Sequence, residues 1–129
     1  LEEYYRFLRG KNEGLVHFWP KELFLKGWLI SYQSGGSIRP HMHEESWITG
    51  SVYINIPKRK MPESGNLVLC LDAESQHDKS SNLNTSLDVV TGSICLFPAS
   101  LLHYTIPFES SEDRIVLAFD LIPKGSQIA

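Results

Sequence analysis

The chain has 129 residues, 42% of them hydrophobic, and a formal net charge of −3. This length supports one sizeable core, so we expect a single domain over residues 1–129. The weak negative charge gives no field that would attract nucleic acid, and no apolar run approaches the roughly 20 residues that cross a bilayer. We therefore expect a cytoplasmic protein that binds neither nucleic acid nor membrane, and a homo-oligomeric state stays open. The leucine at position 1 is consistent with a piece of a longer chain.

Residues 1–26 predict a short amphipathic helix, ended by Gly10, and a lead-in. From Trp28 onward, runs rich in β-branched and aromatic residues are separated by Gly, Pro, Ser and Asn at short intervals. Because no helices alternate with these runs, the pattern predicts an all-β fold, a sandwich or a barrel. Residues 72–86 are a long polar loop, and the length of this loop motivates the hypothesis of a lid over the site. Strands are predicted at residues 27–33, 38–42, 48–56, 65–71, 87–90, 93–97, 103–107 and 114–121.

The two cysteines, Cys70 and Cys95, each lie among aliphatic residues of a predicted strand. Free cysteine is one of the most frequently buried residue types and packs like a small hydrophobic side chain. We therefore interpret both as core positions rather than as a disulfide or as catalytic thiols.

Three histidines are the candidate metal ligands. His41 and His43 are two residues apart in Pro40-His41-Met42-His43, so on a strand both rings would face the same side. His103 follows a glycine- and proline-containing turn, at the start of a later predicted strand. Imidazole nitrogen suits iron, zinc, copper and nickel, so we predict that these three rings converge on one divalent metal, with iron as the expected ion. The other histidines are interpreted as ordinary side chains: His17 and His77.

Several blocks of sequence follow one another in a set order: residues 40–54, 65–67, 92–103, 107–108 and 114–120. This order resembles the 2-oxoglutarate- and Fe(II)-dependent oxygenase family over residues 28–123, and the most similar branch is often attached to tetratricopeptide repeats. The resemblance implies a double-stranded β-helix, a cupin-like jelly roll of two antiparallel sheets with the metal at its open end. It also implies a dioxygenase that uses Fe(II) and 2-oxoglutarate, hydroxylates an unidentified substrate, and releases succinate and CO2.

The same resemblance implies side chains that hold the distal carboxylate of 2-oxoglutarate. Arg114 stands on the strand after His103, where the family places a carboxylate-binding arginine, and its planar fork can bind both oxygens. Tyr53 and Tyr32 are similar in position to tyrosines that hydrogen-bond this carboxylate in prolyl-hydroxylase-type relatives, although both could equally be packed strand residues. The hydroxyl residue that the family usually has two positions after the arginine is absent, because Val116 stands there.

His43 is the main departure from the family. Most relatives have an aspartate or glutamate at this position, which gives two histidines and one carboxylate on the iron. Either three neutral imidazoles bind the metal here, or Glu44 or Glu45 supplies the carboxylate. Because the similar branch carries the same pair of histidines, we favour His43.

Two other functions remain open. The spacing of Gly92, Pro98 and His103 also resembles a cupin signature, and cupin thiol dioxygenases hold iron with three histidines and no cosubstrate. Such an enzyme has no need of Arg114, so a titration with 2-oxoglutarate separates it from an oxygenase. A non-catalytic binding barrel with a structural metal is disfavoured, because structural zinc sites prefer cysteine ligands.

Two tryptophans could line a substrate pocket, although aromatic residues on strands more often lie in the core: Trp28 and Trp47.

Overall fold

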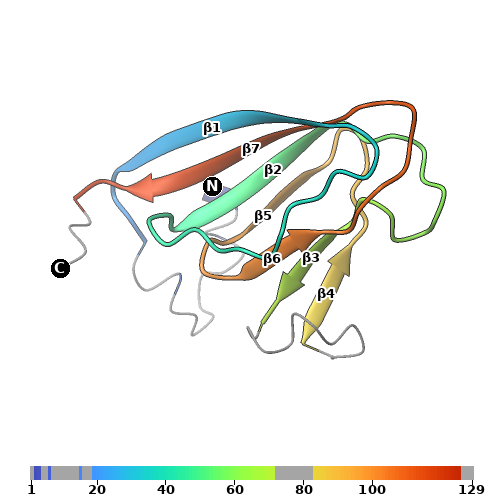
Figure 1. Cartoon of the computed structure of the whole chain (residues 1–129). Helices are drawn as coiled ribbons and strands as arrows, with labels where there is room; N and C mark the ends of the chain where they lie inside the picture. The colour runs from blue at the N-terminus through green and yellow to red at the C-terminus, as the bar shows by residue number, and fades with distance from the viewer. Residues whose placement is uncertain (1, 4–5, 7–14, 16–18, 72–82, 126–129) are drawn as a thin grey trace.

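In the computed structural model, residues 2–3, 6, 15, 19–71 and 83–125 are described. No helix in this part of the chain combines the length and the apolar character needed to cross a bilayer. The strands are shown in Figure 1. They are β1 (Leu23–Tyr32), β2 (Ile48–Asn55), β3 (Leu67–Cys70), β4 (Asn84–Leu87), β5 (Ile94–Pro98), β6 (Leu102–Thr105) and β7 (Arg114–Pro123).

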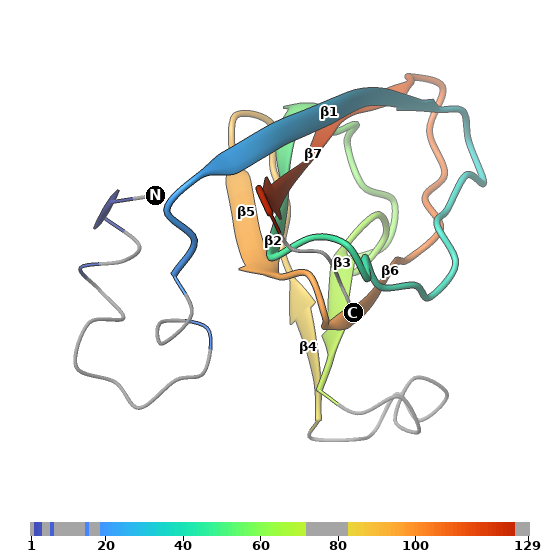
Figure 2. The same cartoon turned by 90° about the vertical axis from the view of Figure 1, so that its left-hand side faces the viewer.

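The strands form two antiparallel sheets. One sheet has four strands in the order β1-β7-β2-β5, and the other has three in the order β4-β3-β6. The two views of the chain show these sheets as two facing layers (Figures 1 and 2). Apart from β3 and β4, which are consecutive, the paired strands are distant in the sequence, as expected for a jelly roll, and the predicted all-β double-stranded β-helix is confirmed.

The core lies between the two layers and is built from alternate residues of the strands. On β7 every second residue from Arg114 to Asp120 is buried, so this buried row begins and ends with a charged residue. Strand residues of one parity share a face, so this row points between the sheets. The buried apolar cluster consists of Tyr53, Leu67, Val89, Phe97 and Val116.

The predicted strand at residues 38–42 is wrong. This segment makes only an isolated bridge between His41 and His103, together with two hydrogen bonds between Ile38 and Thr105. Pro40 lies within it and has no N–H, so it cannot contribute a donor to a continuous ladder. The segment therefore runs beside β6 without becoming a strand.

The predicted strand at residues 87–90 is also misplaced, because β4 occupies Asn84–Leu87. β4 is an edge strand of the three-stranded sheet, and its two central residues, Thr85 and Ser86, are exposed. A polar edge strand lacks the apolar alternation that marks a strand in sequence, so its residues were assigned to the long loop. Residues 72–82 of that loop lie outside the described part of the chain, as do most of the predicted N-terminal helix, His17 and His77.

Both cysteines behave as predicted. Cys70 in β3 is buried, Cys95 in β5 is half-buried, and both are free thiols. Burial raises the pKa of each thiol above its ordinary value, which keeps both sulfurs protonated at neutral pH.

Gly50 in β2 is required by close packing, and this can be tested against a matched glycine. Gly50 and Gly27 both pair with Phe119, from opposite sides. A Cβ at Gly50 would lie 2.6 Å from the Cys95 carbonyl oxygen and 2.6 Å from the Phe119 ring, whereas at Gly27 the nearest atom would be 3.5 Å away. We expect Gly50→Ala to lower the free energy of unfolding by about 1–3 kcal/mol.

Gly27→Ala is the control, and it should be neutral or slightly stabilising, because alanine loses less backbone entropy than glycine on folding. Chemical denaturation of the two variants measures the difference. Equal stability of the two proteins would contradict the packing described for β2 and β5.

Candidate metal centre

His41 and His103 are brought together by backbone pairing. The His41 N–H donates to the His103 carbonyl at 3.0 Å, and the His103 N–H donates back to His41 at 2.9 Å. Two residues paired in this way place their side chains on the same side. The ring centroids are consequently 4.2 Å apart, and His103 is buried with Phe97 edge-on to its ring.

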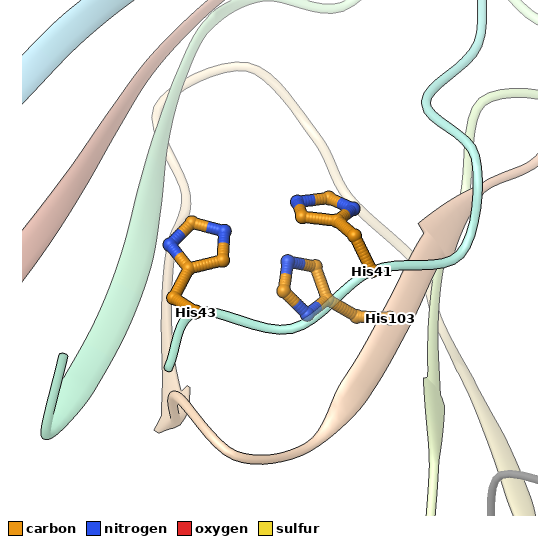
Figure 3. A group of neighbouring side chains, drawn as sticks. All are labelled: His41, His43 and His103. Carbon is orange, nitrogen blue, oxygen red and sulfur yellow. The ribbon is translucent and has the colours of Figure 1, made fainter. Parts of the chain in front are cut away.

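His43 completes the group from the turn that leads into β2. Its N–H donates to the Ala99 carbonyl at 3.0 Å, which ties the turn to the end of β5. The His43 ring centroid lies 5.0 Å from that of His41 and 5.2 Å from that of His103. The three rings are turned toward one another (Figure 3), and one ligand atom of each lies within 4.8 Å of the others.

Each of the three rings is oriented by a hydrogen bond at Nδ1. The His41 Nδ1–H donates to the Arg39 carbonyl and the His103 Nδ1–H to the Leu101 carbonyl, both at 2.9 Å. The His43 Nδ1–H donates to Asp120. Because a carbonyl or carboxylate only accepts, the neutral form of each ring carries its proton on Nδ1, and Nε2 then has a free lone pair. This is the arrangement in which histidine binds metals.

The site favours neutral imidazole at its most buried position. Burial, together with the nearby His41 and His43, lowers the pKa of His103 to about 4, although the Leu101 carbonyl and Asp120 act in the opposite direction. His103 is therefore unprotonated at neutral pH. A metal does not have to displace a proton from this ligand.

The structure corrects the reason for the convergence. His41 and His43 were predicted to share a face of one strand, but pairing with β6 and the turn before β2 position them instead. The alternative ligands, Glu44 and Glu45, are both exposed in that turn, and the metal-binding group found among the described residues consists of the histidines alone.

A cavity between the sheets joins the histidines to the three predicted carboxylate-binding residues. Its lining includes all three histidines together with Arg114, Tyr53 and Tyr32. Arg114 is only 3% exposed, and its guanidinium lies 5.6 Å from the ring centroid of each tyrosine. These residues come from β1, β2 and β7, which are adjacent in one sheet.

Polar groups beside this cavity lack partners. Arg114 donates from one terminal nitrogen to the Gly65 carbonyl at 3.1 Å, but its buried Nε has no partner among the described residues, nor does the buried Tyr32 hydroxyl. Buried polar atoms are normally hydrogen-bonded, so a ligand with acceptor atoms would suit this region. Burial lowers the pKa of Arg114 from its high ordinary value and raises the pKa of Tyr53 to about 12. The Tyr53 hydroxyl thus stays protonated and able to donate.

One residue of the site, Asp120, was missed in the sequence, and Trp28 was predicted there only as an alternative to a core position. Asp120 lay within the predicted strand at residues 114–121 and was given no role, although it is a charged residue in an apolar run, an even number of positions from Arg114, and so on the same face of the strand. Trp28 was left undecided, and it lines the cavity, with its ring stacked 5.9 Å from that of His43. Trp47 does not line this cavity and instead packs edge-on against Trp19. Val116, where the family's hydroxyl was expected, is buried.

Comparisons with known proteins agree with this description. A family model described as "Putative 2OG-Fe(II) oxygenase" matches residues 26–120. A search of the curated proteins finds no match.

Similar folds occur in solved structures. A prolyl-4-hydroxylase from Pseudomonas putida has a TM-score of 0.61 and 16% identity, over 78% of this chain and 52% of that one. HygX from Streptomyces hygroscopicus, with nickel and 2-oxoglutarate bound, has a TM-score of 0.58 and 14% identity, over 78% of this chain and 59% of that one. An oxidoreductase of the 2OG-Fe(II) oxygenase family from Burkholderia pseudomallei has a TM-score of 0.60 and 11% identity, over 94% of this chain and 57% of that one. The chain thus spans 52–59% of the length of these proteins.

Proposed function

The chain belongs to the 2-oxoglutarate- and Fe(II)-dependent oxygenase family, and from this premise we propose that it hydroxylates a substrate with O2 as the oxidant. One oxygen atom of O2 enters the substrate, and the other enters the succinate that forms when 2-oxoglutarate loses CO2. The observation that carries the proposal is one cavity with metal-ligand atoms and a buried guanidinium in its wall. When bound, Fe(II) and 2-oxoglutarate would supply the electrons that activate O2, and the protein supplies binding, orientation and a dry site.

The residues present fit the metal. Three imidazoles with free Nε2 atoms form a nitrogen donor set that suits Fe(II), and three ligands leave coordination positions for a bidentate cosubstrate. His41, His43 and His103 would hold the ion from one side. The Nδ1 hydrogen bonds keep the rings oriented before metal arrives, which lowers the entropic cost of binding.

The residues present also fit a dicarboxylate. Arg114 would bind the distal carboxylate through its two terminal nitrogens or through Nε, the atom that has no partner. The Tyr32 hydroxyl, also without a partner, and the protonated Tyr53 hydroxyl would donate to the same carboxylate. Burial makes these charge-assisted bonds stronger than they would be in water.

Cosubstrate consumption tests the proposal. Protein reconstituted anaerobically with Fe(II) is titrated with 2-oxoglutarate by calorimetry and then exposed to oxygen, with succinate measured. We expect saturable binding and slow release of succinate even without the true substrate. Absence of both from protein that holds Fe(II) would refute the proposal.

A second candidate is a cupin-type dioxygenase that holds iron with three histidines and uses no 2-oxoglutarate, and it is favoured by one observation, a histidine where most relatives have a carboxylate. The same calorimetric titration separates the two. A cupin-type enzyme would bind Fe(II) and leave 2-oxoglutarate unbound, with Arg114 serving only to bind the Gly65 carbonyl.

A further inference from the structure

The partner of His43 differs in kind from those of the other two histidines. Its Nδ1 lies 2.8 Å from one carboxylate oxygen of Asp120 and 2.9 Å from the other. His41 and His103 donate instead to neutral backbone carbonyls. The charged acceptor is therefore attached to the one histidine that stands where most of the family has a carboxylate ligand.

The pair is shielded from water. The side chains of His43 and Asp120 are 14% and 10% exposed, and the Trp28 ring stacks on His43. Asp120 is held by β7, between β1 and β2, so its position is set by two strand pairings rather than by a loop. A buried carboxylate loses its hydrogen bonds to water and needs a donor within the protein, and the His43 N–H is such a donor.

A carboxylate behind a metal-binding histidine fixes its tautomer, orients the ring and makes the metal-binding nitrogen more basic. We propose that Asp120 is a positioning residue that raises the metal affinity of the three-histidine site through His43. It thereby supplies, one ring away from the ion, the negative charge that a carboxylate ligand supplies directly in most relatives. This inference rests on the metal centre of the proposed function.

The role of Asp120 is tested by measuring the metal affinity of the folded protein, and this measurement does not require catalytic activity. Metal-free protein is titrated anaerobically with Co(II), whose visible spectrum reports coordination, and Fe(II) affinity follows by competition. Asp120→Asn keeps the shape of the side chain and removes its charge, and Asp120→Ala removes the hydrogen bond as well. We expect Co(II) and Fe(II) affinity to fall about 10-fold for Asp120→Asn and up to about 100-fold for Asp120→Ala.

Glu45→Gln is the matched control, because it removes an exposed carboxylate two residues from His43 that makes no bond to the ring. Its affinity should change by less than about fivefold, since exposed charges interact weakly. An equal loss of affinity in Glu45→Gln and Asp120→Asn would mean that the hydrogen bond from His43 to Asp120 has no special effect on metal binding, and it would overturn the proposal. Unchanged metal affinity with a lower melting temperature of the metal-free Asp120 variants would assign Asp120 a structural role and also overturn it.

His43→Ala separates this inference from the proposed function. Loss of Co(II) binding in His43→Ala, combined with normal binding in both Asp120 variants, refutes the role of Asp120 and leaves the metal centre standing. If the unmodified protein binds no Co(II) or Fe(II), the metal centre fails and the inference fails with it.

Discussion

His103→Ala is expected to remove measurable Fe(II) binding at micromolar protein. Structural zinc sites with four ligands gain about 10–16 kcal/mol in all, so one ligand accounts for about 3 kcal/mol, or roughly two orders of magnitude in affinity. Burial lowers the pKa of His103 to about 4, so its loss removes a donor that is unprotonated at neutral pH. Anaerobic Fe(II) titration of the metal-free variant measures the effect.

Met42→Ala is the control for this change. Met42 lies between the two other histidines in sequence and is 44% exposed. The Met42→Ala variant should therefore bind Fe(II) as the unmodified protein does. Because His103 is buried, its replacement also opens a small cavity, and thermal unfolding of the metal-free variant must show that the protein stays folded. Normal Fe(II) affinity in folded His103→Ala would place the metal elsewhere.

Arg114→Ala is expected to weaken the binding of 2-oxoglutarate by at least about 2 kcal/mol, which is roughly 30-fold in affinity. The affinity for Fe(II) in the absence of 2-oxoglutarate should not change. Removing one partner of a buried charge pair costs this much or more, because the other charge is left unpaired. Arg114→Lys keeps the charge but not the planar fork, so an intermediate loss is expected. Calorimetry with Fe(II)-loaded protein measures the affinity for 2-oxoglutarate of the unmodified protein, Arg114→Ala and Arg114→Lys.

The control for Arg114 is Arg39→Lys, a change of the same kind in an exposed residue. It should bind 2-oxoglutarate as the unmodified protein does. If both Arg114 variants also retain full affinity, the buried guanidinium does not hold the cosubstrate, and the cupin-type alternative gains support.

The family and the three histidines could be recognised from sequence because they depend on residue identity and order. The structure brings the three histidines together as predicted, yet for a different reason from the one that the sequence suggested. Strand parity was the argument for His41 and His43, whereas Pro40 prevents a strand and backbone pairing with His103 does the positioning. A cross-strand partner more than sixty residues away cannot be read from local periodicity.

Other features escaped because the sequence signal was weak or ambiguous. β4 is polar as an exposed edge strand, so it resembled a loop. Asp120 could have been noticed by its parity with Arg114, but its partner His43 is distant in sequence, and only the fold shows that the two meet. The uncertainty over Glu44 and Glu45 had the same origin, because only the turn geometry shows that both side chains are exposed.

The most direct test is a crystal structure obtained anaerobically with Fe(II) and 2-oxoglutarate, with the ion identified by anomalous scattering at the iron edge. The account predicts one iron bound by Nε2 of His41, His43 and His103, with the distal carboxylate of 2-oxoglutarate on Arg114. An iron bound through Glu44 or Glu45, or a cosubstrate that makes no contact with Arg114, would contradict it.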